Sequence, residues 1–81
     1  MGATSIQVRV PDLGDVGDVV VVEWLKSAGD VVADGDDLVE VETEKTAFVI
    51  PAPVSGRVGT ITAEAGDRLR VGELLGNIET E

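Results

Sequence analysis

Apolar and polar residues alternate with a period of two in parts of the chain, and this pattern predicts β-strands. In the segment VEVETE, residues 39–44, Val39, Val41 and Thr43 fall on one face and the glutamates fall on the other. Successive side chains of a strand point to opposite faces of a sheet, so one face of this strand should be buried and the other solvated. DVVVVEWL and GRVGTITA, residues 18–25 and 56–63, are rich in the β-branched residues that favour strands. No stretch has a convincing helical period, and we expect an all-β fold.

The sequence also repeats itself at a spacing of 37 residues. AGDVVADGDDLVEVETE at 28–44 aligns without a gap on AGDRLRVGELLGNIETE at 65–81. Further strands are expected before Pro11 and before the prolines that follow residue 50. Neither copy has enough strands to enclose a core, so the two should pack about a pseudo-two-fold axis. We therefore predict two four-stranded antiparallel sheets, in a flattened barrel or barrel-sandwich hybrid.

The repeat also predicts where Lys45 lies. Only a tight turn fits between the strand that ends near Thr43 and the strand that begins near Ala47, so Glu44 and Lys45 should form its tip. The counterpart of Glu44 in the second copy is Glu81, the last residue of the chain. We expect Lys45 at one extremity of the domain and both chain ends at the other.

Composition and charge narrow the possible functions. The 81 residues include no cysteine and no histidine, which argues against a self-sufficient hydrolase or metalloenzyme. The net charge of −10 would repel nucleic acid and attract a basic protein partner, although it also favours solubility. Apolar runs are too short to cross a membrane and no signal peptide is visible, so a cytoplasmic or organelle-matrix location is expected. The carboxylates of DGDD, residues 34–37, lack the spacing of a calcium loop and predict a turn.

Lys45 itself has three interpretations. A nucleophilic amine must be held partly uncharged by burial or by a nearby cation, whereas Glu42 and Glu44 favour the charged form. A solvated lysine paired with one of these glutamates would contribute only about 0–1 kcal/mol and need have no other role. In the third interpretation Lys45 is an attachment point, because another enzyme can supply the activated group if this domain supplies a protruding amine on a rigid support.

A longer motif around Lys45 resembles a known family. The run VETEKTAFVIPAPVSGRV, residues 41–58, is similar to the lipoyl domain of 2-oxo acid dehydrogenase acyltransferases, and the likeness extends from VRVPDLG to LGNIE. In that family the lysine after Glu-Thr-Asp or Glu-Thr-Glu bears lipoic acid in amide linkage, and it corresponds to Lys45. Aspartate is commoner at the position of Glu44, but the charge is the same. The family also has glycines sixteen residues before and eleven residues after the lysine, which are Gly29 and Gly56. The resemblance thus implies lipoyl attachment at Lys45 and recognition through Glu42, Glu44, Thr46, Gly29 and Gly56.

The biotinyl domain shares the fold and the position of the lysine. Its lysine usually lies between methionines, whereas Glu44 and Thr46 flank Lys45 here and the only methionine is Met1. These neighbours favour a lipoyl domain, with a biotinyl carrier or an unmodified assembly domain as the alternatives.

The resemblance implies a carrier that catalyses no step itself. Its expected partners are a thiamin-diphosphate-dependent 2-oxo acid decarboxylase, an acyltransferase core, dihydrolipoamide dehydrogenase, and the lipoate ligase or lipoyl transferase that modifies Lys45. We expect residues 1–81 to be one monomeric domain excised from a longer dihydrolipoamide acyltransferase, located in the cytoplasm or, in a eukaryote, in the mitochondrial matrix. The acidic tip and the loop DLGDVGD, residues 12–18, are candidate contacts with these partners.

Overall fold

The computed structural model describes residues 4–14 and 17–80, which form eight strands. Within these residues there is no helix, and so none that could cross a membrane. The strands are β1 (Thr4–Arg9), β2 (Asp18–Trp24), β3 (Val31–Val32), β4 (Asp37–Glu42), β5 (Ala47–Pro51), β6 (Gly56–Ile61), β7 (Arg68–Arg70) and β8 (Leu74–Thr80).

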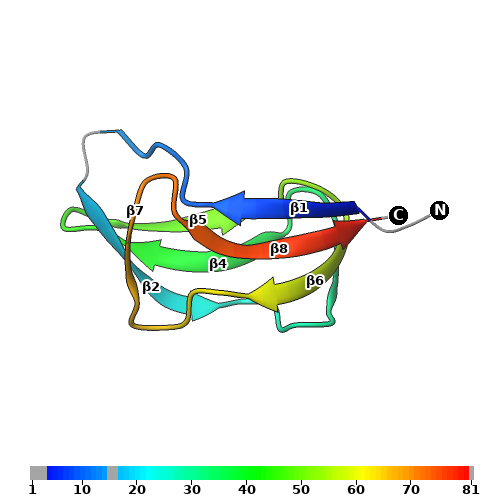
Figure 1. The fold of residues 1–81 in the computed structure, drawn as a ribbon. Coiled ribbons are helices and arrows are strands. Elements are labelled where there is room, and N and C mark those ends of the chain that lie inside the picture. The colour runs from blue at the N-terminus through cyan, green and yellow to red at the C-terminus, as the bar shows by residue number, and fades with distance from the viewer. Residues whose placement is uncertain (1–3, 15–16, 81) are drawn as a thin grey trace.

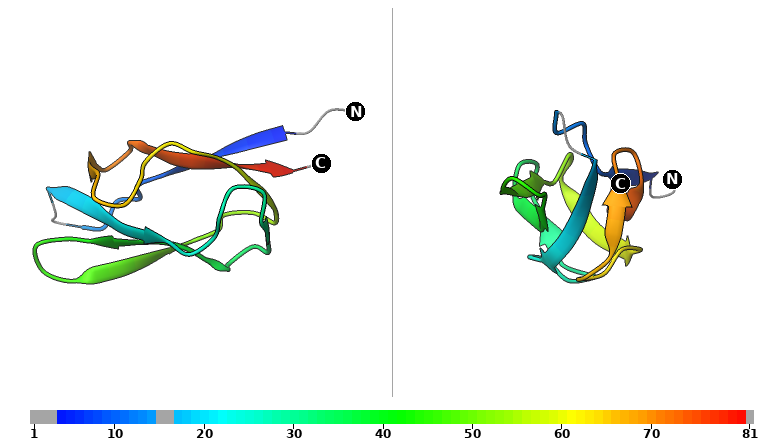
Figure 2. Two further views of the ribbon diagram at one scale, coloured as in Figure 1. Left: turned by 90° about the horizontal axis from the view of Figure 1, so that it is seen from below. Right: turned by 90° about the vertical axis from the view of Figure 1, so that its left-hand side faces the viewer.

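The strands form two antiparallel sheets that face each other across one core (Figures 1 and 2). The strand orders are β1-β8-β6-β3 in one sheet and β5-β4-β2-β7 in the other. The body is elongated, with principal extents of 42 × 20 × 19 Å. The predicted all-β fold with two four-stranded sheets is therefore confirmed, and the sheets stay separate instead of closing into a barrel.

The two sheets are related by the internal repeat, because β2, β3 and β4 correspond to β6, β7 and β8. The turns after β2 and β6 show this correspondence in detail. Gly29 N–H donates to the Val58 carbonyl at 2.7 Å, and its counterpart Gly66 N–H donates to the Val21 carbonyl at 2.7 Å. Both glycines have a positive φ, 93° and 95°, a backbone conformation that glycine adopts without steric cost. Each of these two bonds joins one copy to the other, so the turns link the two halves of the chain.

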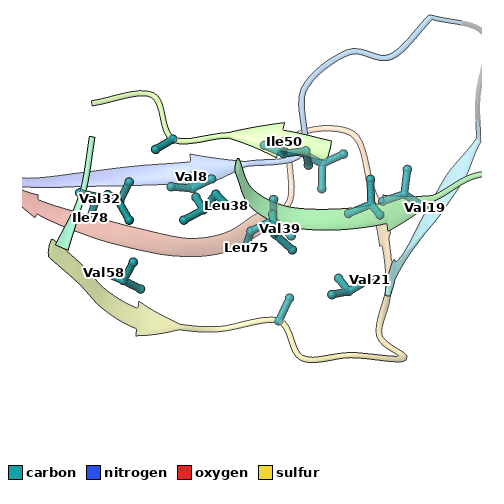
Figure 3. Close-up of a cluster of buried hydrophobic side chains, with 14 residues drawn as sticks. Val8, Val19, Val21, Val32, Leu38, Val39, Ile50, Val58, Leu75 and Ile78 are labelled. Carbon is teal, nitrogen blue, oxygen red and sulfur yellow. The ribbon is translucent and has the colours of Figure 1, made fainter. Parts of the chain in front are cut away.

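The core between the sheets is built mainly from valine (Figure 3). Full burial of a valine side chain stabilises the fold by roughly 1.5–3 kcal/mol relative to exposure. The run of valines in β2 divides between the two faces: Val19 and Val21 are buried, while Val22 lies at a register shift and is 38% exposed. The buried apolar residues are Val8, Val10, Val19, Val21, Val32, Leu38, Val39, Val41, Ile50, Ala52, Val58, Ala63, Leu75 and Ile78.

Trp24 and residues 34–37 both have structural roles, and the turn at residues 34–37 is the one that the sequence predicts. Trp24 packs against the core, and its indole N–H donates to the Ala63 carbonyl at 2.7 Å. The acidic segment turns between β3 and β4, where the Asp36 carboxylate accepts the Ala33 N–H at 2.9 Å. This carboxylate therefore stabilises the turn.

Gly56 lies where two strands approach too closely for a side chain. A Cβ at this position would lie 2.8 Å from Ile78 Cγ2 and would overlap the backbone carbonyl oxygen of Glu79. Both atoms belong to β8, which pairs with β6 in the middle of the sheet. They cannot move without disturbing the sheet.

We expect Gly56→Ala to lower the free energy of unfolding by about 1–3 kcal/mol, because the added methyl group overpacks the β6–β8 contact. Urea unfolding followed by Trp24 fluorescence measures this change. Gly17→Ala is the matched control, since no atom lies within 4 Å of a Cβ built there. Equal unfolding midpoints for the two variants would contradict the close approach.

Candidate functional site

Lys45 lies in the turn of the β4–β5 hairpin, at one end of the long axis. β4 ends at Glu42 and β5 begins at Ala47, and these two residues pair directly. Thr4 and Thr80 pair at the opposite end, where Figure 1 shows the start of β1 and the end of β8. The predicted position of the lysine, at a tight turn far from the ends of the chain, is confirmed.

The side chain of Thr43 braces this turn from inside. Thr43 is only 9% exposed, and its hydroxyl oxygen accepts the backbone N–H groups of Lys45 and Thr46, each at 3.1 Å. The same hydroxyl donates to the Thr46 carbonyl at 2.9 Å, which also accepts the Thr43 N–H at 2.8 Å. A threonine hydroxyl can satisfy backbone groups two and three residues further on, and here it fixes the backbone that carries the lysine.

The sequence did not identify Thr43 as a functional residue, although it contained a signal. Thr43 is the polar member of the buried series Val39, Val41 and Thr43. A buried hydroxyl needs hydrogen-bond partners, so a threonine at the end of an apolar strand face indicates a local polar contact.

The side chains that surround the tip leave the amine of Lys45 in solvent. Glu42, Glu44, Lys45 and Thr46 are all exposed. The part of the chain that the structure describes has two ion pairs, Arg68–Asp18 and Arg70–Asp18, and neither involves Lys45. The geometry therefore differs from that of a buried nucleophilic lysine and matches that of a side chain open to another protein.

The two glycines predicted to take part in recognition lie away from this tip. Gly56 pairs with Val32, and the next residue of β6 pairs with Glu79 near the chain ends. Gly29 shapes the turn after β2. The structure thus brings Glu42, Glu44 and Thr46 together with Lys45, while both glycines serve the body of the domain; their part in recognition stays a prediction.

A shallow hollow adjoins the hairpin on the β2 side. It has a volume of about 350 Å³ and is lined by Gly17, Asp18, Val20, Arg68 and residues 42–44. Arg68 lies 3.6 Å from Asp18 in an exposed ion pair. The loop at 12–18 therefore ends beside the tip, and residues 15–16 lie outside the described residues. Its contact with partners stays a prediction.

Comparison with known proteins identifies the family. Residues 6–78 match the model of the biotin/lipoyl family, described as "Biotin-requiring enzyme", and the chain belongs to this family. It is 42% identical over 76 residues to the dihydrolipoyllysine-residue succinyltransferase component of the 2-oxoglutarate dehydrogenase complex of Bartonella vinsonii subsp. berkhoffii. That match covers 93% of this chain and 18% of the relative, so the chain spans under a fifth of the length of this curated protein.

Two solved structures share the fold. The lipoyl domain of the 2-oxoglutarate dehydrogenase complex from Azotobacter vinelandii matches with a TM-score of 0.75 and 31% identity, over 94% of this chain and 96% of that one. The Kluyveromyces lactis urea carboxylase matches with a TM-score of 0.79 and 25% identity, over 93% of this chain and 6% of that one. The predicted membership of the lipoyl and biotinyl attachment family is confirmed.

We expect Thr43→Val to loosen the tip and to lower the free energy of unfolding by about 0.5–1.5 kcal/mol, because the hydroxyl bonds are lost at nearly constant volume. Hydrogen exchange at the Lys45 and Thr46 amides should accelerate, and Thr43→Ser should restore it. Thr46→Val is the control, since the Thr46 hydroxyl makes only a 3.5 Å contact with the Ala47 carbonyl. Unchanged exchange in Thr43→Val would show that the hydroxyl does not brace the turn.

Proposed function

We propose that this domain carries lipoic acid in amide linkage to Lys45 and acts as the swinging-arm carrier of a 2-oxo acid dehydrogenase complex. The observation that supports this most directly is the exposed amine of Lys45 at the tip of a braced hairpin. The similarity to an acyltransferase component and to a lipoyl domain adds support. A biotinyl carrier is the second candidate, favoured by the fold shared with urea carboxylase and opposed by Glu44 and Thr46 beside the lysine.

The residues at the tip suit the attached group. Lys45 is exposed and no described carboxylate holds its amine, so a ligase can reach it. The bound group would supply a dithiolane that accepts an acyl group and two electrons. The chain itself holds the arm at the end of the domain, which raises the effective concentration of the acyl group at each partner enzyme.

Attachment changes the charge of the tip. Amide formation removes the positive charge of Lys45 and lowers the formal net charge by one unit from −10. Glu42 and Glu44 then lack a neighbouring lysine charge, and this acidic tip directs the domain toward basic surfaces around the active sites of its partners. These partners are the 2-oxo acid decarboxylase, the acyltransferase core and dihydrolipoamide dehydrogenase.

The proposal extends to the parent protein. The matched region is 18% of the relative from Bartonella, which supports a longer dihydrolipoamide acyltransferase in which this domain is one part. The domain would contribute no catalysis of its own, and the complex would work in the cytoplasm or, in a eukaryote, in the mitochondrial matrix.

Incubation with lipoate, ATP and a lipoate–protein ligase should add one lipoyl group to the wild-type chain and none to Lys45→Arg. Intact mass measures this. Lys26→Arg changes the only other lysine and should be modified like the wild type. A parallel incubation with biotin, ATP and a biotin ligase should add nothing. A biotin adduct on Lys45 without a lipoyl adduct would favour the second candidate, and a lipoyl adduct on Lys26 would remove Lys45 from its role.

We expect Glu42→Gln/Glu44→Gln to slow reductive acylation of the lipoylated domain by about threefold to tenfold at low ionic strength and to flatten its salt dependence. The rate with a 2-oxo acid decarboxylase, measured across a salt series, tests this. Glu64→Gln removes an exposed charge outside the hairpin and should have a much smaller effect. An unchanged rate with an unchanged salt dependence would show that the acidic tip does not steer the encounter.

A further inference from the structure

The two sheets are related by the repeat, yet their outer faces differ. On the outer face of the β1-β8-β6-β3 sheet, polar side chains bond to one another. Asn77 Oδ1 accepts the Thr60 backbone N–H at 2.6 Å, and Asn77 Nδ2 donates to Ser5 Oγ at 2.6 Å. Gln7 lies opposite Asn77 and accepts a bond from Arg9 at 2.6 Å. Several polar groups of this face thus bond within the face.

On the other sheet, carboxylates occupy the corresponding positions. Glu40 is the repeat counterpart of Asn77, and Glu23 is the counterpart of Thr60. Glu23 and Glu40 pair directly across β2 and β4, where two like charges destabilise a sheet. Both ion pairs found among the described residues involve Asp18, and neither Glu23 nor Glu40 forms one. No ion pair among the described residues therefore neutralises either glutamate.

Apolar side chains complete this face beside the hairpin tip. Val49 pairs with Glu40 across β4 and β5 and is 46% exposed. Val49 therefore corresponds to Gln7 of the other sheet, because Gln7 pairs with Asn77, the counterpart of Glu40. Ala47 is exposed opposite Glu42, one step closer to Lys45. The face thus combines exposed aliphatic groups with glutamates and continues to the tip without a break.

We propose that this outer face of β2, β4 and β5 is the docking surface for the enzyme that attaches the lipoyl group to Lys45. The surface is defined by Glu23, Glu40, Glu42, Ala47 and Val49. The matching partner surface is apolar at its centre, where it covers Val49, and carries lysine or arginine side chains at the glutamates. This inference rests on the proposed function, because it takes Lys45 as the modified residue.

Two physical arguments favour the modifying enzyme as the occupant. It must bring its active site to the amine before any arm exists, so its surface reaches the hairpin and the sheet face next to it. Enzymes that act later meet the far end of a flexible arm and need not cover this face. Cations of the partner would also relieve the repulsion between Glu23 and Glu40, so the charges that destabilise the free domain favour the complex.

The outer face of the β1-β8-β6-β3 sheet, here called the sister face, supplies substitutions for a test. The same fold already holds these residues at the corresponding positions. Glu40→Asn/Val49→Gln gives this face the residues of Asn77 and Gln7 and leaves the tip intact. With a lipoate–protein ligase as the probe, we expect kcat/KM for modification of Lys45 to fall about tenfold, mainly through KM. Gln7→Val makes the reverse exchange on the sister face and should stay within about twofold of wild type. Thermal unfolding should show no loss of stability in the double variant, because the like-charge pair is removed.

Glu23→Thr is a second, independent variant, since it introduces the residue of Thr60 without changing the hairpin. It should lower kcat/KM about threefold and weaken the salt dependence of modification. Wild-type modification with unchanged kcat/KM in both face variants would overturn the docking surface and leave the proposed function intact. An equal loss in Gln7→Val would also overturn it. Failure of the wild type to be modified would instead remove the proposed function.

Discussion

The fold depends on one constraint: neither copy of the repeat can bury its apolar face alone. Each sheet takes strands from both copies, as β2 pairs with β7 and β3 pairs with β6. The turn that closes one copy bonds to the backbone of the other through Gly29 and Gly66. The core, the elongated body and the position of the hairpin all follow from this interlocking, since a chain that packs about a pseudo-two-fold axis must place its midpoint turn opposite its ends.

The hairpin needs a second device, because packing alone does not fix the conformation of an exposed turn. Thr43 supplies it by directing a hydroxyl from the buried face of β4 into the turn, where it meets the backbone of Lys45 and Thr46. The hydrogen-bonded backbone of the turn thus carries an exposed side chain at Lys45. The proposed carrier role would need both a fixed backbone and an exposed amine, because the modifying enzyme must find the amine in one place.

Sequence reasoning predicted the strands, the repeat, the turn and the exposed lysine, because these depend on local periodicity and on chain connectivity. It did not predict the hydrogen bonds of Thr43, since periodicity assigns a residue to a face and leaves its partners undefined. The tight contact at Gly56 depends on β8, which is distant in sequence, and the exposed Val22 depends on a register shift. The contrast between the two outer faces required the pairing of Glu23 with Glu40, which only the register reveals.

The pairing of Thr4 with Thr80 has a consequence for how the domain can be joined to other proteins. Entry and exit of the chain lie side by side, so the domain can be inserted into a surface loop of a host without forcing the two flanks of that loop apart. The hairpin would then point away from the host. The same module can therefore sit at either terminus or in the middle of a longer polypeptide and expose its lysine in the same way.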